Sequence, residues 1–203
     1  AEVVAGFPPP YDHTYTGPDE TKASIHPSLN PLMELADGTL VMQLISGHPL
    51  KLTEGHAHVN HWGSVHCMAF STRSTDGGRT WSGLSHLSGH PSYGRNLDLT
   101  EAYQAQLKTG QILTLTRPIY SPWMWETRSD DGAKSWGASV RGPLPGYACT
   151  MLPHESASGA VVIGGRLPGL ALHCSFDGGM AWQTWQVDRS FWAMGTMYEV
   201  EPD

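Results

Sequence analysis

The 203-residue chain has little charge, and charge of one sign does not accumulate anywhere along it. Only 15% of its residues are charged, the formal net charge is −7, and no run rich in lysine or arginine occurs. Nucleic acids and anionic membrane surfaces attract basic patches, so neither is an expected partner. No apolar stretch approaches the roughly 18 residues of a bilayer-spanning helix, so we expect no membrane span.

Cysteines and helical patterns are also scarce. Cys67, Cys149 and Cys174 form an odd set without a CxxC pair, so buried free thiols are the simpler interpretation than a disulfide framework. Helical periodicity is poor, and the one candidate, DLTEAYQAQLKTG (98–110), fits better as a strand. The chain is instead rich in glycine (23) and proline (15), which indicates many turns and few long helices.

Three similar eight-residue segments stand out, and each begins with Ser-x-Asp and ends with tryptophan. Aspartate can accept hydrogen bonds from N–H groups of its own turn, and glycine can take a positive φ. Each segment is therefore expected to close a tight turn between two strands, with the tryptophan opening the second strand. We call them the first, second and third Ser-x-Asp turns: STDGGRTW (74–81), SDDGAKSW (129–136) and SFDGGMAW (175–182).

The surroundings of the three turns repeat as well. An apolar strand pair with a turn precedes each one, at 32–45, 105–116 and 151–165, followed by a loop and a third strand. Four antiparallel strands at a period of about 40–50 residues are typical of a β-propeller blade. We expect an N-terminal arm over 1–28 and a partial propeller over 29–203. Its blades are expected near 29–87, 103–141 and 148–188, with the start of a fourth at 194–203.

The three turns resemble the Asp-box, or BNR-repeat, motif S-x-D-x-G-x-T-W of the sialidase (neuraminidase) superfamily. The first turn matches it fully, the second has Ala133 for Gly and Ser135 for Thr, and the third has Ala181 for Thr. The resemblance covers roughly residues 24–203. It implies an all-β, six-bladed propeller, of which about three and a half blades are present in this chain. It also implies hydrolysis of terminal sugars and a secreted or periplasmic location.

The chain departs from that family in two respects. A ring closed by three blades lies outside the usual four to eight, so we expect further blades from a longer chain or from a second copy. Classical sialidases enter the first blade with Arg-Ile-Pro, whereas this chain has Ile25-His26-Pro27. The first arginine of the carboxylate-binding triad is therefore absent there, which leaves open whether the sugar is sialic acid.

The candidate site is expected at the sheet ends opposite the Ser-x-Asp turns, where the loops are irregular and rich in His, Arg, Trp and Tyr. Arg117 and Arg166 end the second strands of the second and third blades at equivalent positions. A planar guanidinium suits the carboxylate of an acidic sugar. Alternatively, each arginine pairs with a neighbouring carboxylate and only braces a loop.

Histidines occupy the matching region of the first blade. His48 lies at the position equivalent to the two arginines, and His56, His58 and His61 follow in the next loop. They are candidates to bind substrate hydroxyls or to act as general acid or base. A metal site is the weighed alternative, but no fixed ligand motif supports it, so we expect neither a metal nor a cofactor.

Three carboxylates are candidates for proton transfer. Glu101 and Asp98 lie in the link that enters the second blade. Glu126 stands where the sister repeats have Ser71 and Leu172, so partial burial would raise its pKa. The alternative for Glu126 is a salt bridge.

Aromatic residues complete the candidate set. Tyr198-Glu199 resembles the tyrosine–glutamate nucleophile pair that sialidases use. Tyr120 and Trp123 are expected to stack on sugar rings, as is Trp125 unless it packs in the core.

The leading interpretation is a glycoside hydrolase that acts on a terminal acidic sugar, with a glycan or polysaccharide as partner. A non-catalytic carbohydrate-binding propeller and an interaction scaffold are the alternatives. A carboxylate pair or tyrosine–carboxylate pair about 5–10 Å apart would favour the hydrolase.

Overall fold

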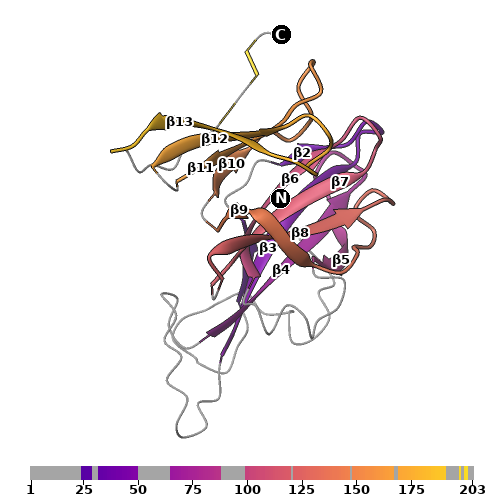
Figure 1. Cartoon of the computed structure of the whole chain (residues 1–203). Helices are drawn as coiled ribbons and strands as arrows, with labels where there is room; N and C mark the ends of the chain where they lie inside the picture. Colours follow the sequence, from indigo (N-terminus) through magenta and orange to yellow (C-terminus); the bar gives the residue numbers. More distant parts are fainter. Residues whose placement is uncertain are drawn as a thin grey trace, which may run out of the picture.

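The computed structural model describes residues 24–28, 32–49, 65–87, 99–119, 121–146, 148–166, 169–190, 197 and 199–200. Over these residues the fold is all-β, with three antiparallel sheets that follow one another along the chain (Figure 1). No helix among the described residues is long and apolar enough to cross a membrane.

The first sheet contains a split edge strand. Its path runs β1 (Ser24–Pro27), β3 (Leu40–Pro49), β4 (Val65–Ser74) and β5 (Ser82–His86). The short β2 (Met33–Glu34) pairs with the start of β3, and β1 pairs with residues 44–47 further along the same strand. β1 therefore lies within residues 1–28, the expected N-terminal arm. Proline is tolerated on an edge strand, and Pro27 ends this one.

The second and third sheets are regular four-stranded meanders. The second contains β6 (Leu99–Gln106), β7 (Ile112–Pro118), β8 (Trp123–Ser129) and β9 (Val140–Pro145). The third contains β10 (Ala148–Met151), β11 (Val161–Gly165), β12 (Leu170–Ser175) and β13 (Gln183–Asp188). The repeated four-strand unit is thus confirmed, and β6 shows that residues 99–106 of the candidate helix form a strand.

The second sheet is buried on both faces. Successive side chains of a strand point to opposite faces, and its strands carry apolar residues on both. On β7, Ile112 packs toward the first sheet with Met33 and Val41, whereas Leu113 packs toward the third sheet with Ile163. The outer strand β13 of the third sheet differs, since all six of its residues are exposed. The core therefore lies in two apolar layers, one on each side of the second sheet.

The three Ser-x-Asp turns close on themselves, as the sequence predicts. Asp76, Asp131 and Asp177 each accept a hydrogen bond from the backbone N–H four residues ahead, at 2.9 Å in every case. The Thr80 hydroxyl holds the pKa of Asp76 at about 2. At Asp131 burial raises the pKa, but the hydrogen bonds from the Ser135 hydroxyl and N–H and from the Ser129 hydroxyl together outweigh it, and the pKa is also about 2.

Candidate functional site

Both ends of the second sheet are defined by its strand pairing. Gln106 pairs with Ile112 around the β6–β7 turn, and Ile112 pairs with Ser129 at the start of the second Ser-x-Asp turn. Glu101, near the start of β6, and Arg117, near the end of β7, therefore lie at the opposite end. Arg166 follows the last residue of β11, at the corresponding end of the third sheet.

Glu101, Arg117 and Arg166 come together there, and we call them the arginine–glutamate cluster. Arg117 Nη1 donates to Glu101 Oε2 at 3.1 Å, and Arg166 Nη2 lies 3.8 Å from the same oxygen. The side chains are 6%, 11% and 5% exposed, respectively, so the three charges are largely removed from water. Attraction between charges is stronger in such surroundings than on an open surface. The cluster thereby joins the second sheet to the third.

Tyr103 supports this cluster and was not among the candidates from the sequence. Its ring is fully buried, and its hydroxyl lies 3.3 Å from Glu101 Oε2 and 3.1 Å from the carbonyl oxygen of Ala148. Residues two apart on a strand share a face, so the Glu-x-Tyr pattern of β6 was the available signal. Because Tyr103 is buried, its hydroxyl contacts Glu101 from within the core.

Glu126 does not join the cluster, and its expected role in proton transfer stays a prediction. Its Oε1 accepts a hydrogen bond from Arg128 Nε at 2.6 Å, two residues along the same strand β8. The salt bridge weighed as the alternative is therefore what the structure contains. The physical reason is again the shared face of residues two apart on a strand.

Glu199 is also separate from the cluster, and its expected catalytic role stays a prediction. It is exposed, and its Oε1 accepts from the Ala157 N–H at 3.2 Å. Ala157 lies in the connection between β10 and β11, whereas Arg166 lies beyond the far end of β11. Glu199 is thus at the turn end of the third sheet, and no sister repeat was present in the sequence to indicate this.

The other candidates are only partly described. Trp123 begins β8, at the same end of the second sheet as Arg117, and the residue is 37% exposed. The Arg141 guanidinium carbon lies 5.0 Å from the centroid of the Trp123 ring, which is a cation–π contact. The backbone of His48 pairs with that of His66 in the first sheet, but its side chain lies outside the described residues. So do the candidates Asp98, His56, His58, His61, Tyr120 and Tyr198.

Comparisons with known proteins give a likeness of fold. No family model matches the chain, and no curated protein matches it in sequence. It is similar to a solved protein of unknown function from Dyadobacter fermentans DSM 18053, with a TM-score of 0.56 and 19% identity over 80% of this chain and 50% of that one. For the Hadza microbial sialidase Hz136 the TM-score is 0.56, with 16% identity over 82% and 38%. The fold is sialidase-like.

A further similar structure is the intramolecular trans-sialidase from Ruminococcus gnavus in complex with oseltamivir carboxylate. Its TM-score is 0.52, with 12% identity over 81% of this chain and 54% of that one. The expected fold class is therefore confirmed, and the three sheets are blades of a partial sialidase-like β-propeller. The chain spans between 38% and 54% of the length of these three proteins. At such low identity the likeness shows the fold alone.

Proposed function

We propose that the chain forms part of the substrate site of a sialidase-like glycoside hydrolase acting on a terminal acidic sugar. In this proposal Arg117 and Arg166 bind the carboxylate of the sugar. The observation that supports it is the arginine–glutamate cluster, in which guanidinium groups from two adjacent blades flank one carboxylate oxygen. The cluster lies at the sheet ends opposite the Ser-x-Asp turns, where a propeller carries its irregular loops.

The charge and geometry of the cluster suit an anion. The three side chains carry two positive charges and one negative charge, so the cluster favours a ligand that brings a second carboxylate. A guanidinium has five N–H donors in a rigid plane, and the contact with Glu101 engages one nitrogen of each arginine. Charge-assisted bonds to a carboxylate are about twice as strong as neutral ones, which favours acidic over neutral sugars.

Glu101 is assigned a positioning role rather than a role in proton transfer. Its Oε2 lies within 3.8 Å of Arg117 Nη1, Arg166 Nη2 and the Tyr103 hydroxyl oxygen, and its side chain is only 6% exposed. A carboxylate held in this way fixes the two arginines in one orientation. Asp98 then stays the proposed acid or base. His48, His56, His58, His61, Tyr120 and Trp123 stay proposed sugar contacts.

The second candidate function is a non-catalytic carbohydrate-binding propeller. It is favoured by the positions of Glu126 and Glu199, since one is paired with Arg128 and the other lies at the turn end. Neither supplies a second carboxylate beside Glu101. Binding of acidic sugars without any turnover would support this second function.

Conservative arginine variants test the proposal. Arg117→Lys and Arg166→Lys keep the charge but lose the planar donor array, so binding of sialic acid or glucuronic acid should weaken about 10- to 100-fold. Binding of galactose should change little. Isothermal titration calorimetry gives the affinities, and fluorogenic glycosides of the same three sugars report hydrolysis. Lys134→Ala is the matched control, because it alters an exposed cation on the second Ser-x-Asp turn at the other end of the sheet.

Two results would contradict parts of this assignment. Equal losses for acidic and neutral sugars in both lysine variants would mean that the arginines only brace the loops. Glu101→Gln separates positioning from proton transfer through the pH profile of hydrolysis. If Glu101 positions the arginines, the variant binds acidic sugars more weakly but keeps the shape of the profile. Loss of one limb of the profile would instead make Glu101 the acid or base.

A further inference from the structure

A cleft lies at the turn end of the molecule, between the second and third sheets. This open cleft has a volume of about 560 Å³, within the range of about 300–1,000 Å³ that is usual for small-molecule sites. Its walls come from the β6–β7 turn, the second Ser-x-Asp turn, the β10–β11 connection and the third Ser-x-Asp turn. Residues from all four walls line it, including Thr109, Gln111, Asp130, Glu155 and Phe176.

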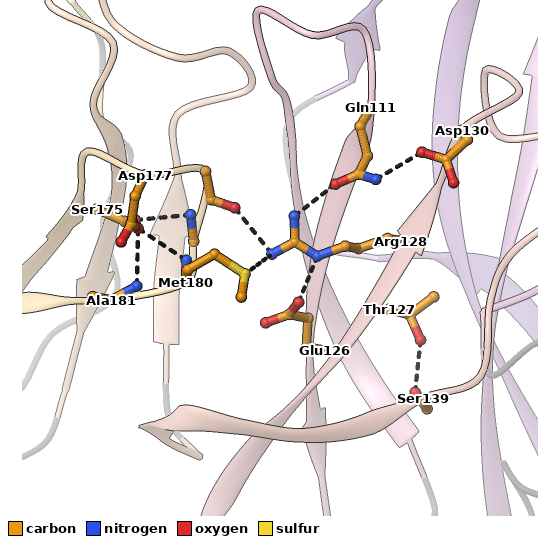
Figure 2. Close-up of polar contacts among 12 residues, drawn as sticks. Gln111, Glu126, Thr127, Arg128, Asp130, Ser139, Ser175, Asp177, Met180 and Ala181 are labelled. Atoms are coloured by element: carbon orange, nitrogen blue, oxygen red, sulfur yellow. Dashed lines mark hydrogen bonds and ion pairs between the residues drawn. The ribbon is translucent and has the colours of Figure 1, made fainter.

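Arg128 holds the polar wall of this cleft in a fixed arrangement (Figure 2). Its Nη1 donates to Gln111 Oε1 at 2.6 Å, its Nη2 donates to the carbonyl oxygen of Gly178 at 2.9 Å, and its Nε is paired with Glu126. The Gln111 amide in turn donates to Asp130 Oδ1 at 2.7 Å. This chain of bonds orients Asp130 before any ligand arrives, which reduces the entropic cost of binding.

The wall presents hydrogen-bond acceptors. Asp130 uses Oδ1 for Gln111, and Glu155 uses Oε2 to accept from the Lys108 N–H at 2.8 Å. The other oxygen of each carboxylate has no donor within the described part of the chain. The lining contains three carboxylates, those of Asp130, Glu155 and Asp177, and one guanidinium, that of Arg128. The charge of Arg128 is already balanced by its salt bridge with Glu126. Such a lining accepts bonds from hydroxyl groups and repels anions.

The third Ser-x-Asp turn adds an apolar surface that the turn itself does not require. Phe176 is 59% exposed where the first and second turns have Thr75 and Asp130. Met180 is 75% exposed where they have Arg79 and Lys134, and it lies beside the Arg128 guanidinium (Figure 2). All three turns close through the same bond from the backbone N–H four residues ahead to the aspartate, so the exposed aromatic ring is unexplained by folding. An exposed ring beside fixed acceptors is typical of a surface that stacks on a sugar.

We propose that this cleft is a binding site for an uncharged saccharide, separate from the arginine–glutamate cluster. The apolar face of a sugar ring stacks on Phe176, and its hydroxyl groups donate to Asp130 and Glu155. The carboxylates make the cleft unfavourable for acidic sugars, the opposite preference to that proposed for Arg117 and Arg166. This inference does not depend on the proposed hydrolase function.

The test measures binding of galactose, lactose and maltotriose by saturation-transfer NMR and calorimetry. At least one should bind saturably, and glucuronic acid should bind at least tenfold more weakly at this site. Phe176→Thr, which copies Thr75 of the first turn, should weaken that binding at least tenfold, and Asp130→Asn should weaken it severalfold. Thr75→Ala is the control at the equivalent position of the first turn and should have no effect.

Three outcomes would overturn the proposal. The first is that none of the three neutral sugars binds. The second is that Phe176→Thr binds as the unaltered protein does, with circular dichroism confirming that it is folded. The third is that Arg117→Lys abolishes the same binding, since that would place the neutral sugar at the cluster instead.

Discussion

The position after the first glycine of each Ser-x-Asp turn offers a test of how tightly the blades pack. Gly78, Ala133 and Gly179 occupy it, with φ of 84°, 63° and 90°. All three are left-handed, yet the second turn already carries a β-carbon there. Its methyl group is fully buried in the core between the first and second sheets. The backbone conformation therefore tolerates alanine. How much an alanine destabilises the fold at the other two positions depends on the atoms around it.

Those surroundings differ between the first and third turns. A β-carbon at Gly78 would lie 3.6 Å from Leu40 Cδ1, an ordinary contact, whereas one at Gly179 would lie 2.6 Å from Leu113 Cδ2. Gly78→Ala should thus lower the free energy of unfolding only by the cost of placing alanine in the left-handed conformation, about 1 kcal/mol. The lower flexibility of the unfolded chain partly offsets this cost. Gly179→Ala adds overpacking of about 1–3 kcal/mol, for a total of about 2–4 kcal/mol.

Urea denaturation at neutral pH measures both variants, with Gly78→Ala as the matched control. A double variant sharpens the test: Leu113→Val removes the clashing methyl group, so it should recover part of the stability lost in Gly179→Ala. Equal losses in the two alanine variants, or no recovery in the double variant, would refute this account of the contact between the second and third blades.

Two further predictions concern the turns and the tryptophans. Asp76 and Asp131 have a folded pKa of about 2 against an ordinary value of 3.8, so their contribution to stability is present above about pH 4 and is lost as the pH falls toward 2. Asp131→Asn should therefore flatten the acid limb of a stability–pH curve, and an unchanged limb would contradict the assignment. Trp136→Phe should cost about 1–3 kcal/mol, because the buried Ser71 hydroxyl loses its indole donor at 2.8 Å. Trp182→Phe loses only a bond to its own turn and should cost less when both variants are compared by urea denaturation.

Much of the fold follows from local chemistry that the sequence displays directly. The Ser-x-Asp turns close within eight residues, so their residue types alone predict them. The equivalence of Arg117 and Arg166 also follows from the repeat, because both end a second strand. β1 was missed because a four-residue segment ending in Pro27 carries no alternating pattern of its own.

The site was less predictable because it depends on contacts between distant residues. The proximity of Glu101 to Arg166 depends on the docking of two sheets, which the spacing of residues along one strand does not encode. Tyr103 has the appearance of a core residue, since nothing in the sequence indicates that its hydroxyl reaches Glu101. The position of Glu199 at the turn end was not predicted, because the residues around it have no sister repeat for comparison.

Polar contacts join the second and third blades at both ends of the interface between them, which we call the seam. Glu101 reaches Arg166 at one end, Arg128 reaches the Gly178 carbonyl at the other, and an apolar layer fills the space between. Both proposed sugar sites lie on this one seam. If both proposals hold, a ligand that stiffens the seam at one end would lower the ordering cost of binding at the other, and the two sites would be linked without any change in the shape of either blade.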